Sequence, residues 1–581
     1  MIAAAQANQT QLDGWVVIDS SGHTPQTHGC SSVRPGRETA VGYVLNRLVA
    51  AKPDAGDPLM LDRLLSLVDG DPASKTRGCM RWYAEESHVA DTNAAFFSVF
   101  PLVALVAVRP DLVPAVDAIR MNELFRQTLP WFADECRNPR LYYPNKIISD
   151  GAMLLAIGTV LDDEAAVHTA VEFLRTWSTY TRERGWGWGE NMSLGYQRVI
   201  LIALRFAIVL AGASDGALAD ALAGYQAEIL AEAAFHDGAE FVPAIRSYNF
   251  SGALRKSAFS YALLGHPESR FEQLAREPGQ AWAKTLALLL FPDELEDTHY
   301  TPPAVPRERT RRIFEGATAT TWVGQGARLG TLSRFPVMPD HYQQDGWGLG
   351  WQSFPVSAAL DDTGVCALYW YARTGDTVTT HPYYGEDGLQ RNYVLAGRRP
   401  YPAVATHAAQ RGGVAIVVRT ISRIHDAPIE FADQWVFRTG RNRVTEHGAW
   451  FVHHSGGAAV AVRPLSRFRS GSDSLEPPGA TTHPLGEDLA VRVLLHSSEE
   501  GALSADRLEA AWLVVALDDV TDPVQLGEYL DTLQITDEAH YDFSLPRMNY
   551  AYTRTISVAD PAAGAVDPVA LHVDYHTDLW R

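Results

Sequence analysis

Hydrophobic positions in the first half of the chain follow helical spacing, in segments of two kinds. One kind is apolar on nearly every face, which is typical of buried helices: 93–108, 151–161, 192–211 and 251–265. The other kind is amphipathic and alternates with the first: 116–135, 163–184 and 216–235. Such alternation, at roughly 40–60 residues per pair, is typical of stacked helical hairpins. The pattern favours an incomplete α/α toroid, and a plain α-solenoid is the alternative.

The pattern changes after the proline-rich stretch TPPAVPRER at 301–309. Short runs rich in β-branched and aromatic residues follow, often alternating polar with apolar positions. They include GVAIVVRTIS, EFADQWVFRTG, AAVAVRPL, LAVRVLLHSS and ALHVDYHTDLW. We therefore expect an α+β multidomain protein, since 581 residues exceed the size of one hydrophobic core. The expected parts are an α/α-toroid domain over 1–300, a linker over 301–312 and an antiparallel β-sandwich over 313–581.

Each apolar helix of the first half opens with a cluster of polar residues: 86–93, 142–150, 186–191 and 246–249. If these helices run parallel in an inner ring, the clusters open at one end of the toroid and form a shared cleft. Helix capping is the alternative explanation. Capping accounts for Asp150 and is an option for Asn93, but it does not explain the tryptophan, histidine, arginine and tyrosine residues of the clusters.

The β half adds one stretch of the same character, 334–355, in which His341 lies among glycine and tryptophan residues. Tryptophan side chains offer flat surfaces that suit stacking on sugar rings. We therefore expect the cleft to bind a polysaccharide. The candidate substrate-binding residues are His88, Asn93, Asn145, Trp186, Trp188, Glu190, Tyr342 and Trp347.

Composition excludes several other classes of partner. The net charge of −20 argues against nucleic acid, because neutralising phosphates needs a basic face. The 4 cysteines are scattered without CxxC spacing, so no metal or cofactor is expected. Arg or Pro interrupts the longest apolar runs, so we expect neither a membrane-spanning helix nor a membrane partner. The start MIAAAQANQTQLDG is not an intact signal peptide, although a secreted or periplasmic location is favoured.

Two reactions fit a polysaccharide cleft of this composition. Hydrolysis needs a pair of carboxyl groups, for which Asp91, Asp150 and Glu190 are candidates. β-Elimination from a uronate instead needs a group that neutralises the carboxylate and a base that removes the C5 proton. Four residues supply that set: Asn191, Arg246, Tyr248 and His341. Arg246 lies two residues before Tyr248, close enough for its charge to lower the pKa of the phenol.

A toroid followed by a β-sandwich resembles the polysaccharide lyases of the chondroitin AC/hyaluronate lyase, alginate lyase and heparinase II/III type. WGEN at 188–191 resembles the asparagine-containing NWW-E-G-type stretch of the hyaluronate lyase group. DGAEFVPAIRSYNFSGAL at 237–254 is similar in spacing to that group's DGSF…YTGAYG segment. Two departures stand out: the family's upstream histidine has no counterpart, and Leu254 stands where the family has its final tyrosine. The resemblance implies that Asn191 neutralises the carboxylate, whereas the roles of Tyr248 and His341 rest on the local sequence.

The sequence therefore predicts a polysaccharide lyase whose partner is an acidic polysaccharide or oligosaccharide. The alternatives are a toroid glycoside hydrolase and a non-catalytic protein that binds glycan through Trp186, Trp188 and Trp347. Arg255 and Lys256 leave a further choice open, because unpaired charge within an apolar helix is costly. They either pair with an acid of a neighbouring helix or line a cleft for an anionic ligand.

Overall fold

The computed structural model of the chain divides into two compact units. Unit 1 comprises 1–186, 196–238 and 257–302, and unit 2 comprises 187–195, 239–256 and 303–581. The structure describes residues 10–49, 57–141, 143–185, 189–212, 215–243, 254–265, 281–293, 299–314, 317–333, 355–361, 364–374, 377–380, 403–423, 429–438, 444–469, 474–500, 508–520, 522–542, 551–561 and 567–576.

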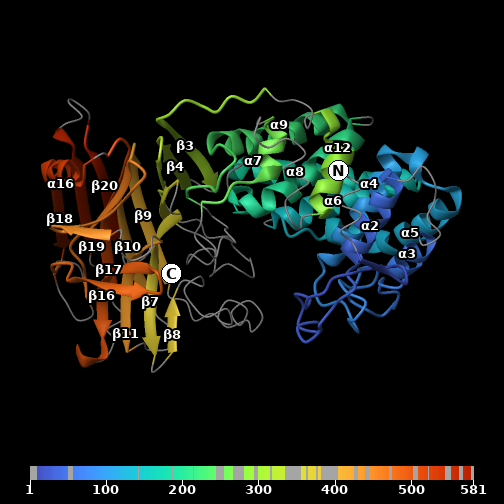
Figure 1. Cartoon of the computed structure of the whole chain (residues 1–581), viewed down its shortest axis with the longest axis horizontal. Helices are drawn as coiled ribbons and strands as arrows, with labels where there is room; N and C mark the ends of the chain where they lie inside the picture. Colours follow the sequence, from blue (N-terminus) through green and yellow to red (C-terminus); the bar gives the residue numbers. More distant parts are fainter. Residues whose placement is uncertain are drawn as a thin grey trace. The chain divides into compact units, whose positions relative to one another are not determined.

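Unit 1 is built from helices (Figure 1). Within the described residues they are α2 (Gly36–Val49), α3 (Asp57–Leu65), α4 (Ala94–Val108), α5 (Ala115–Arg137), α6 (Pro144–Val160), α7 (Glu164–Arg184), α8 (Leu194–Ala211), α9 (Gly216–Phe235), α10 (Ala258–Leu263) and α12 (Ala281–Leu290). The short strands β1 (Thr10–Leu12) and β2 (Trp15–Val17) precede them. Helices α4, α6 and α8 form the apolar inner layer, and their side chains make up much of one continuous core. The amphipathic helices α5 and α7 pack against α6, as the alternating pattern predicts.

The helices of unit 1 close into an incomplete toroid. Helix α12 packs against α2 and α4, although more than 170 residues separate it from α4 in the chain. The indole N–H of Trp282 donates to the carbonyl of Phe97 at 3.0 Å, and its ring meets the rings of Phe97 and Phe100 edge-on. In an α-solenoid each repeat contacts only its neighbours. Contact between the last described helix and the first ones therefore excludes the plain solenoid.

One expected helix is much shorter than its sequence pattern indicates. Of the stretch 251–265, only α10 at Ala258–Leu263 is helical, and 251–253 lie outside the described residues. Lys256 instead forms an antiparallel bridge with Ala239, beside an ion pair of 3.1 Å between Arg255 Nε and Glu240 Oε2. The choice left open by the sequence is decided for Arg255, which pairs with an acid.

Unit 2 contains antiparallel sheets (Figure 1). The nine-stranded sheet comprises β15 (Ala480–Leu485), β16 (Asp488–Ser497), β11 (Glu430–Phe437), β7 (Gly364–Thr374), β6 (Val356–Leu360), β5 (Ala327–Leu332), β4 (Ala317–Val323), β3 (Arg307–Phe314) and β8 (Thr377–Thr380), the last paired with β7. The six-stranded sheet has the order β12 (Val444–His447), β13 (Trp450–Ser455), β14 (Ala458–Pro464), β17 (Leu508–Leu517), β10 (Val414–Arg423) and β9 (Ala403–Arg411). A three-stranded sheet consists of β18 (Gln534–Asp542), β19 (Ala551–Ala559) and β20 (Val569–His576).

The six-stranded sheet is the central layer of unit 2. Along β17, Trp512 and Val514 face the nine-stranded sheet, whereas Leu513 and Val515 face the three-stranded sheet and helix α16 (Pro523–Thr532). A strand buried on both faces is apolar at successive positions, which explains the run AAWLVVAL. The expected sandwich is present, with a third layer that the sequence pattern did not predict.

The stretch expected to link the two halves is part of a sheet. Strand β3 begins at Arg307 and pairs antiparallel with β4, so the second half of 301–312 is not a linker. Arg307 and Glu308 lie opposite Val323 and Trp322 in this register.

Helix α8 satisfies the length and composition criteria for a membrane-spanning helix, despite the two arginines within it. Of this window, 56% is buried inside the protein, as in the core helix of a toroid. Among the described residues, α8 is the one helix that meets these criteria.

Candidate functional site

The structure places the sequence-predicted site residues in both units. His88, Asn93 and Asn145 lie in unit 1, while Glu190 and the backbone of Asn191 lie in the segment 187–195 of unit 2. The remaining candidates fall outside the described residues: Trp186, Trp188, Arg246, Tyr248, His341, Tyr342 and Trp347. The described candidates form two groups, one in each unit.

In unit 1 the polar N-terminal ends of α4 and α6 meet. Nδ2 of Asn93, just before α4, donates to the hydroxyl of Tyr143, just before α6, at 3.5 Å. Asn93 makes no side-chain capping bond, so the capping explanation fails for it. Its Oδ1 is buried and accepts no hydrogen bond from any described residue. Two of the four predicted clusters, 86–93 and 142–150, are thus in contact, and an amide oxygen there has spare hydrogen-bonding capacity.

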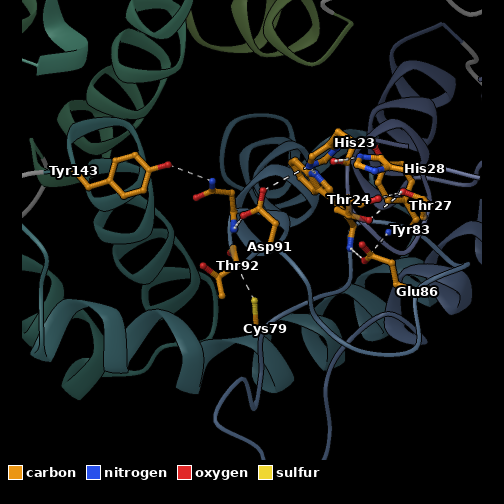
Figure 2. Close-up of polar contacts among 12 residues, drawn as sticks. His23, Thr24, Thr27, His28, Cys79, Tyr83, Glu86, Asp91, Thr92 and Tyr143 are labelled. Atoms are coloured by element: carbon orange, nitrogen blue, oxygen red, sulfur yellow. Dashed lines mark hydrogen bonds and ion pairs between the residues drawn. The ribbon is translucent and has the colours of Figure 1, made fainter. Parts of the chain in front are cut away.

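An aromatic and ionisable group of side chains includes His23, Tyr83 and Asp91 (Figure 2). Nδ1 of His23 lies 2.7 Å from the Tyr83 hydroxyl, and Nε2 of the same ring lies 3.5 Å from Asp91 Oδ2. The indole N–H of Trp82 also contacts Nε2. Asp91 Oδ1 accepts from the backbone N–H of Asn93 at 2.9 Å, which connects this group to the α4 end. The side chains of His23 and Asp91 remain 50% and 35% exposed, so they are open to a ligand.

This group is suited to binding rather than to proton removal. Burial raises the pKa of Tyr83, so its hydroxyl stays protonated near neutral pH. Both ring nitrogens of His23 already have partners, so neither is directed at an incoming proton. The hydroxyl, imidazole and carboxylate together supply the donors and acceptors that sugar hydroxyl groups require.

The loop that contains Tyr83 and Asp91 is held in place by hydrogen bonds to its backbone. Glu86 is 1% exposed and accepts from the backbone N–H groups of Trp82 at 2.7 Å and Tyr83 at 3.3 Å. The Cys79 thiol donates to the carbonyl of Thr92 at 3.6 Å (Figure 2). The side chain of His88 is exposed, and the carbonyl of this residue accepts from Gln26 at 3.0 Å. The loop is therefore a preformed surface.

Beneath this surface, α6 contains a buried charge cluster. Lys146 Nζ lies 2.5 Å from Asp150 Oδ2 and 2.9 Å from Glu135 Oε2. Burial opposes the charge on Lys146, but the two carboxylates outweigh it and hold its pKa above the ordinary value. Burial raises the pKa of Asp150 to about 7. The nearby Glu135 carboxylate acts in the same direction, whereas the Lys146 ammonium lowers the pKa.

Two sequence expectations for 142–150 therefore need correction. Asp150 lies inside α6 and is fully buried, so it is not the N-cap residue of this helix. Asn145 is 1% exposed within the first turn of α6, which leaves its side chain too little surface to contact a substrate. Both corrections have one cause: α6 begins at Pro144, seven residues before the apolar run that starts at residue 151.

In unit 2 the described residues 239–243 contact the nine-stranded sheet. Thr321 Oγ1 of β4 donates to the carbonyl of Val242 at 2.6 Å. Val242 packs with Ala359 and Val365 of β6 and β7. The backbone of Val242 comes so close to β5 that a Cβ on Gly330 would lie 2.2 Å from its carbonyl carbon. Residues 239–243 thus lie on this sheet, although they follow the helix α9 directly in sequence.

The second described group of unit 2 is the 3₁₀ turn Gly189–Met192, which precedes α8. Glu190 in this turn is fully buried. A carboxylate without exposed surface does not contact a substrate, so the expectation that Glu190 binds one is not supported by its burial. The turn places Asn191 at the entrance of α8, as the sequence predicts.

Sequence reasoning did not name His23, Tyr83 or Tyr143 as candidates, although Tyr143 lies in the predicted cluster 142–150. It searched for polar residues where apolar helices begin and in the stretch 334–355, whereas His23 lies in the N-terminal loop. The stretch RWYAEE at 81–86 was the available signal, since an aromatic pair stands there directly before a predicted polar cluster. Among the described residues no group of three or more His, Cys, Asp or Glu side chains is arranged to hold a metal ion.

The sequence matches no family model and no curated protein. Solved structures resemble the chain over most of its length. Heparinase III is 11% identical over 93% of this chain and 82% of its own, with a TM-score of 0.47. The Streptomyces coelicolor A3 chondroitin AC lyase, in complex with chondroitin sulphate, is 11% identical over 91% of this chain and 84% of its own, with a TM-score of 0.45. Heparan sulfate lyase from Pedobacter heparinus is 9% identical over 93% of this chain and 82% of its own, with a TM-score of 0.39. The likeness concerns the fold alone and assigns no residue a role.

Proposed function

We propose that this protein is a polysaccharide lyase that cleaves a uronic-acid-containing polysaccharide by β-elimination. The observation that carries the proposal is the anchoring of Val242 by Thr321 on the nine-stranded sheet. It attaches residues 239–243 to the unit that also contains the turn Gly189–Met192 with Asn191. Arg246 and Tyr248 follow a few residues later in the sequence, and we propose that they join Asn191 in one catalytic group.

The reaction assigns one task to each candidate. The Asn191 amide and the Arg246 guanidinium neutralise the uronate carboxylate, which makes the C5 proton more acidic. Tyr248 removes this proton, while His341 is its partner in proton transfer. The electron pair of the C5–H bond forms the C4–C5 double bond, the C4–O bond breaks, and the leaving oxygen receives a proton from His341, which acts as the acid. Arg246 assists by lowering the pKa of the Tyr248 phenol.

The described residues of unit 1 supply substrate contacts in this proposal. The half-buried side chain of Asn93 lies beside Tyr143, and the partly exposed Asp91 and His23 and the exposed His88 belong to the same unit. These groups suit the hydroxyl groups of a sugar chain, because they include both donors and acceptors. Asn145 and Glu190 are left out of the set of contacts because they are buried.

Burial also weighs against the hydrolase alternative. Of its three candidate carboxylates, Asp150 and Glu190 are fully buried, and Asp150 is paired with Lys146. Asp91 is the one with exposed surface. A glycosidase needs two carboxyl groups on either side of the scissile bond, and this set provides a single accessible one.

The test is ultraviolet absorbance during incubation with alginate, hyaluronan, chondroitin, heparan sulfate, glucuronan and xanthan. We expect at least one polymer to give the rising band of a conjugated unsaturated uronate. Tyr248→Phe and Asn191→Ala should then abolish the band, with losses of about a hundredfold or more. The matched controls are Tyr180→Phe on α7 and Asn122→Ala on α5, which should keep the rate. Reducing ends released without the band, or no product from any polymer, would contradict the proposal.

A further inference from the structure

A cavity of about 290 Å³ lies in the β half, and none of the residues that line it is assigned to the proposed reaction. Strand β4, the turn between β9 and β10, the end of β17, helix α16 and the ends of β19 and β20 contribute to its wall. The aromatic and charged residues that line it are Trp322, Arg411, Asp518, Tyr529, Asp560 and Asp567. Its volume is near the lower limit for small-molecule sites, roughly 300 Å³, which suits a single sugar ring.

Two glycine residues beside the Trp322 ring stand where a side chain would not fit. A Cβ on Gly324 would lie 2.5 Å from this ring and 2.0 Å from Asp518 Oδ2. A Cβ on Gly413, which itself lines the cavity, would lie 3.6 Å from the ring and 2.1 Å from the carbonyl oxygen of Ala516. Both positions therefore need glycine. The indole is packed closely against backbone and presents a fixed aromatic surface to the cavity.

The polar groups of the wall are also fixed. Asp518 Oδ1 accepts from the backbone N–H groups of Gly326 at 2.9 Å and Ala327 at 3.1 Å. The Tyr529 hydroxyl donates to Asp560 Oδ2 at 2.9 Å. One Nη of Arg411 donates to the backbone carbonyl of Asp567. Such a prearranged set loses little conformational freedom when a ligand binds.

The charges on the wall select the class of ligand. Three aspartates against one arginine leave the wall with a net negative charge, which disfavours an anionic polymer such as the substrate of the proposed lyase. Hydroxyl groups donate to carboxylates and accept from a guanidinium, so a wall carrying both suits an uncharged polyhydroxylated ring. We propose that this cavity is a binding site for one neutral sugar unit of a glycan, stacked on Trp322.

The test measures the binding of four neutral oligosaccharides to the full chain by ligand-observed NMR and calorimetry. They are cellotetraose, maltotetraose, mannotetraose and N,N′-diacetylchitobiose. We expect at least one of them to bind with a millimolar or lower Kd. Trp322→Ala should weaken that binding at least tenfold, because the stacking of the sugar ring on the indole is lost. Arg411→Ala should weaken it several-fold, and Asp567→Ala likewise.

Arg411 and Asp567 are exposed, so their variants keep the test valid if the partly buried Trp322 proves necessary for folding. The exposed Asp574 on β20 provides the matched control, and Asp574→Ala should bind like the wild type. Three results would overturn the proposal: no binding of any neutral oligosaccharide at millimolar concentration, binding that Arg411→Ala and Asp567→Ala both leave unchanged, or binding of tetramethylammonium or of a uronate trisaccharide that these two variants change more than they change the binding of the neutral oligosaccharides. Release of unsaturated uronate is unaffected by these variants, so this test and that of the lyase are independent.

Discussion

The hydroxyl of Thr321 donates a 2.6 Å hydrogen bond to the carbonyl of Val242, which attaches the segment 239–256 to the central strands of the nine-stranded sheet. Thr321 is 4% exposed, so water does not replace this bond if the hydroxyl is removed. An unpaired buried acceptor costs about 1–3 kcal/mol.

Thr321→Val should therefore destabilise the attachment of the segment by that amount, since valine has the same shape but no donor. On a polymer that the enzyme cleaves, we expect kcat to fall more than KM rises, because the segment contains the proposed Tyr248. Steady-state kinetics and urea unfolding would measure both effects. Thr318→Val on the same strand is the control, because Thr318 is half-buried on the opposite face of β4. Equal kinetic losses in the two variants would contradict the assigned role of the anchor.

Asn93→Asp should raise KM about tenfold, because a new carboxylate would repel the acidic polymer; a tenfold change corresponds to about 1.4 kcal/mol. Tyr143→Phe removes the partner of the Asn93 amide and should raise KM by a few-fold. Steady-state rates over a range of polymer concentrations are the measurement. Asn122→Asp introduces the same charge in the middle of α5 and should leave KM unchanged. A KM of Asn93→Asp within twofold of the wild type would remove this surface from the binding site.

Lys146→Met should destabilise unit 1 by about 3–5 kcal/mol, because Asp150 would lose its buried counter-ion. The double variant Lys146→Met/Asp150→Leu should recover most of that loss, since the isolated charge is then gone. Glu135 keeps contact with water, as its side chain is 20% exposed. Chemical denaturation measures the free energies, with the exposed Lys75→Met as control. A double variant as unstable as the single one would show that packing, not charge, dominates.

Asp433 should make stability depend on pH between about 4 and 6. Burial raises its pKa to about 6, although the Arg419 guanidinium, 2.6 Å away, acts in the opposite direction. The folded state then binds the proton more tightly than the unfolded state, so stability falls as pH rises through this window and levels off above it. The shift from 3.8 to about 6 corresponds to a change on the order of 3 kcal/mol.

Urea unfolding of wild type and Asp433→Asn at several pH values tests this dependence. The variant should be less stable overall, because Arg419 loses its charged partner, but its stability should change less between pH 4 and 6. The exposed Asp574→Asn should follow the wild type. Parallel curves for wild type and Asp433→Asn would show that another group causes the pH dependence.

The sequence by itself determined that the first half is built from helices and the second half from strands. Inner helices such as α4 and the strand β10 were predicted correctly, because burial on all sides or on both faces leaves an apolar run that local sequence displays. The position of Asn191 at the entrance of α8 also followed from the change in polarity there. Roles for Tyr248 and His341 stay predictions.

Only the tertiary structure decided which distant segments meet. The contact of Trp282 with Phe97 closes the toroid, and the bond from Thr321 to Val242 assigns part of the helical half to the β unit. The pairing of Arg255 with Glu240 likewise resolved a choice that the sequence left open. Periodicity records whether a residue is buried but not which partner buries it, because contacts between segments far apart in the chain leave no local spacing to read.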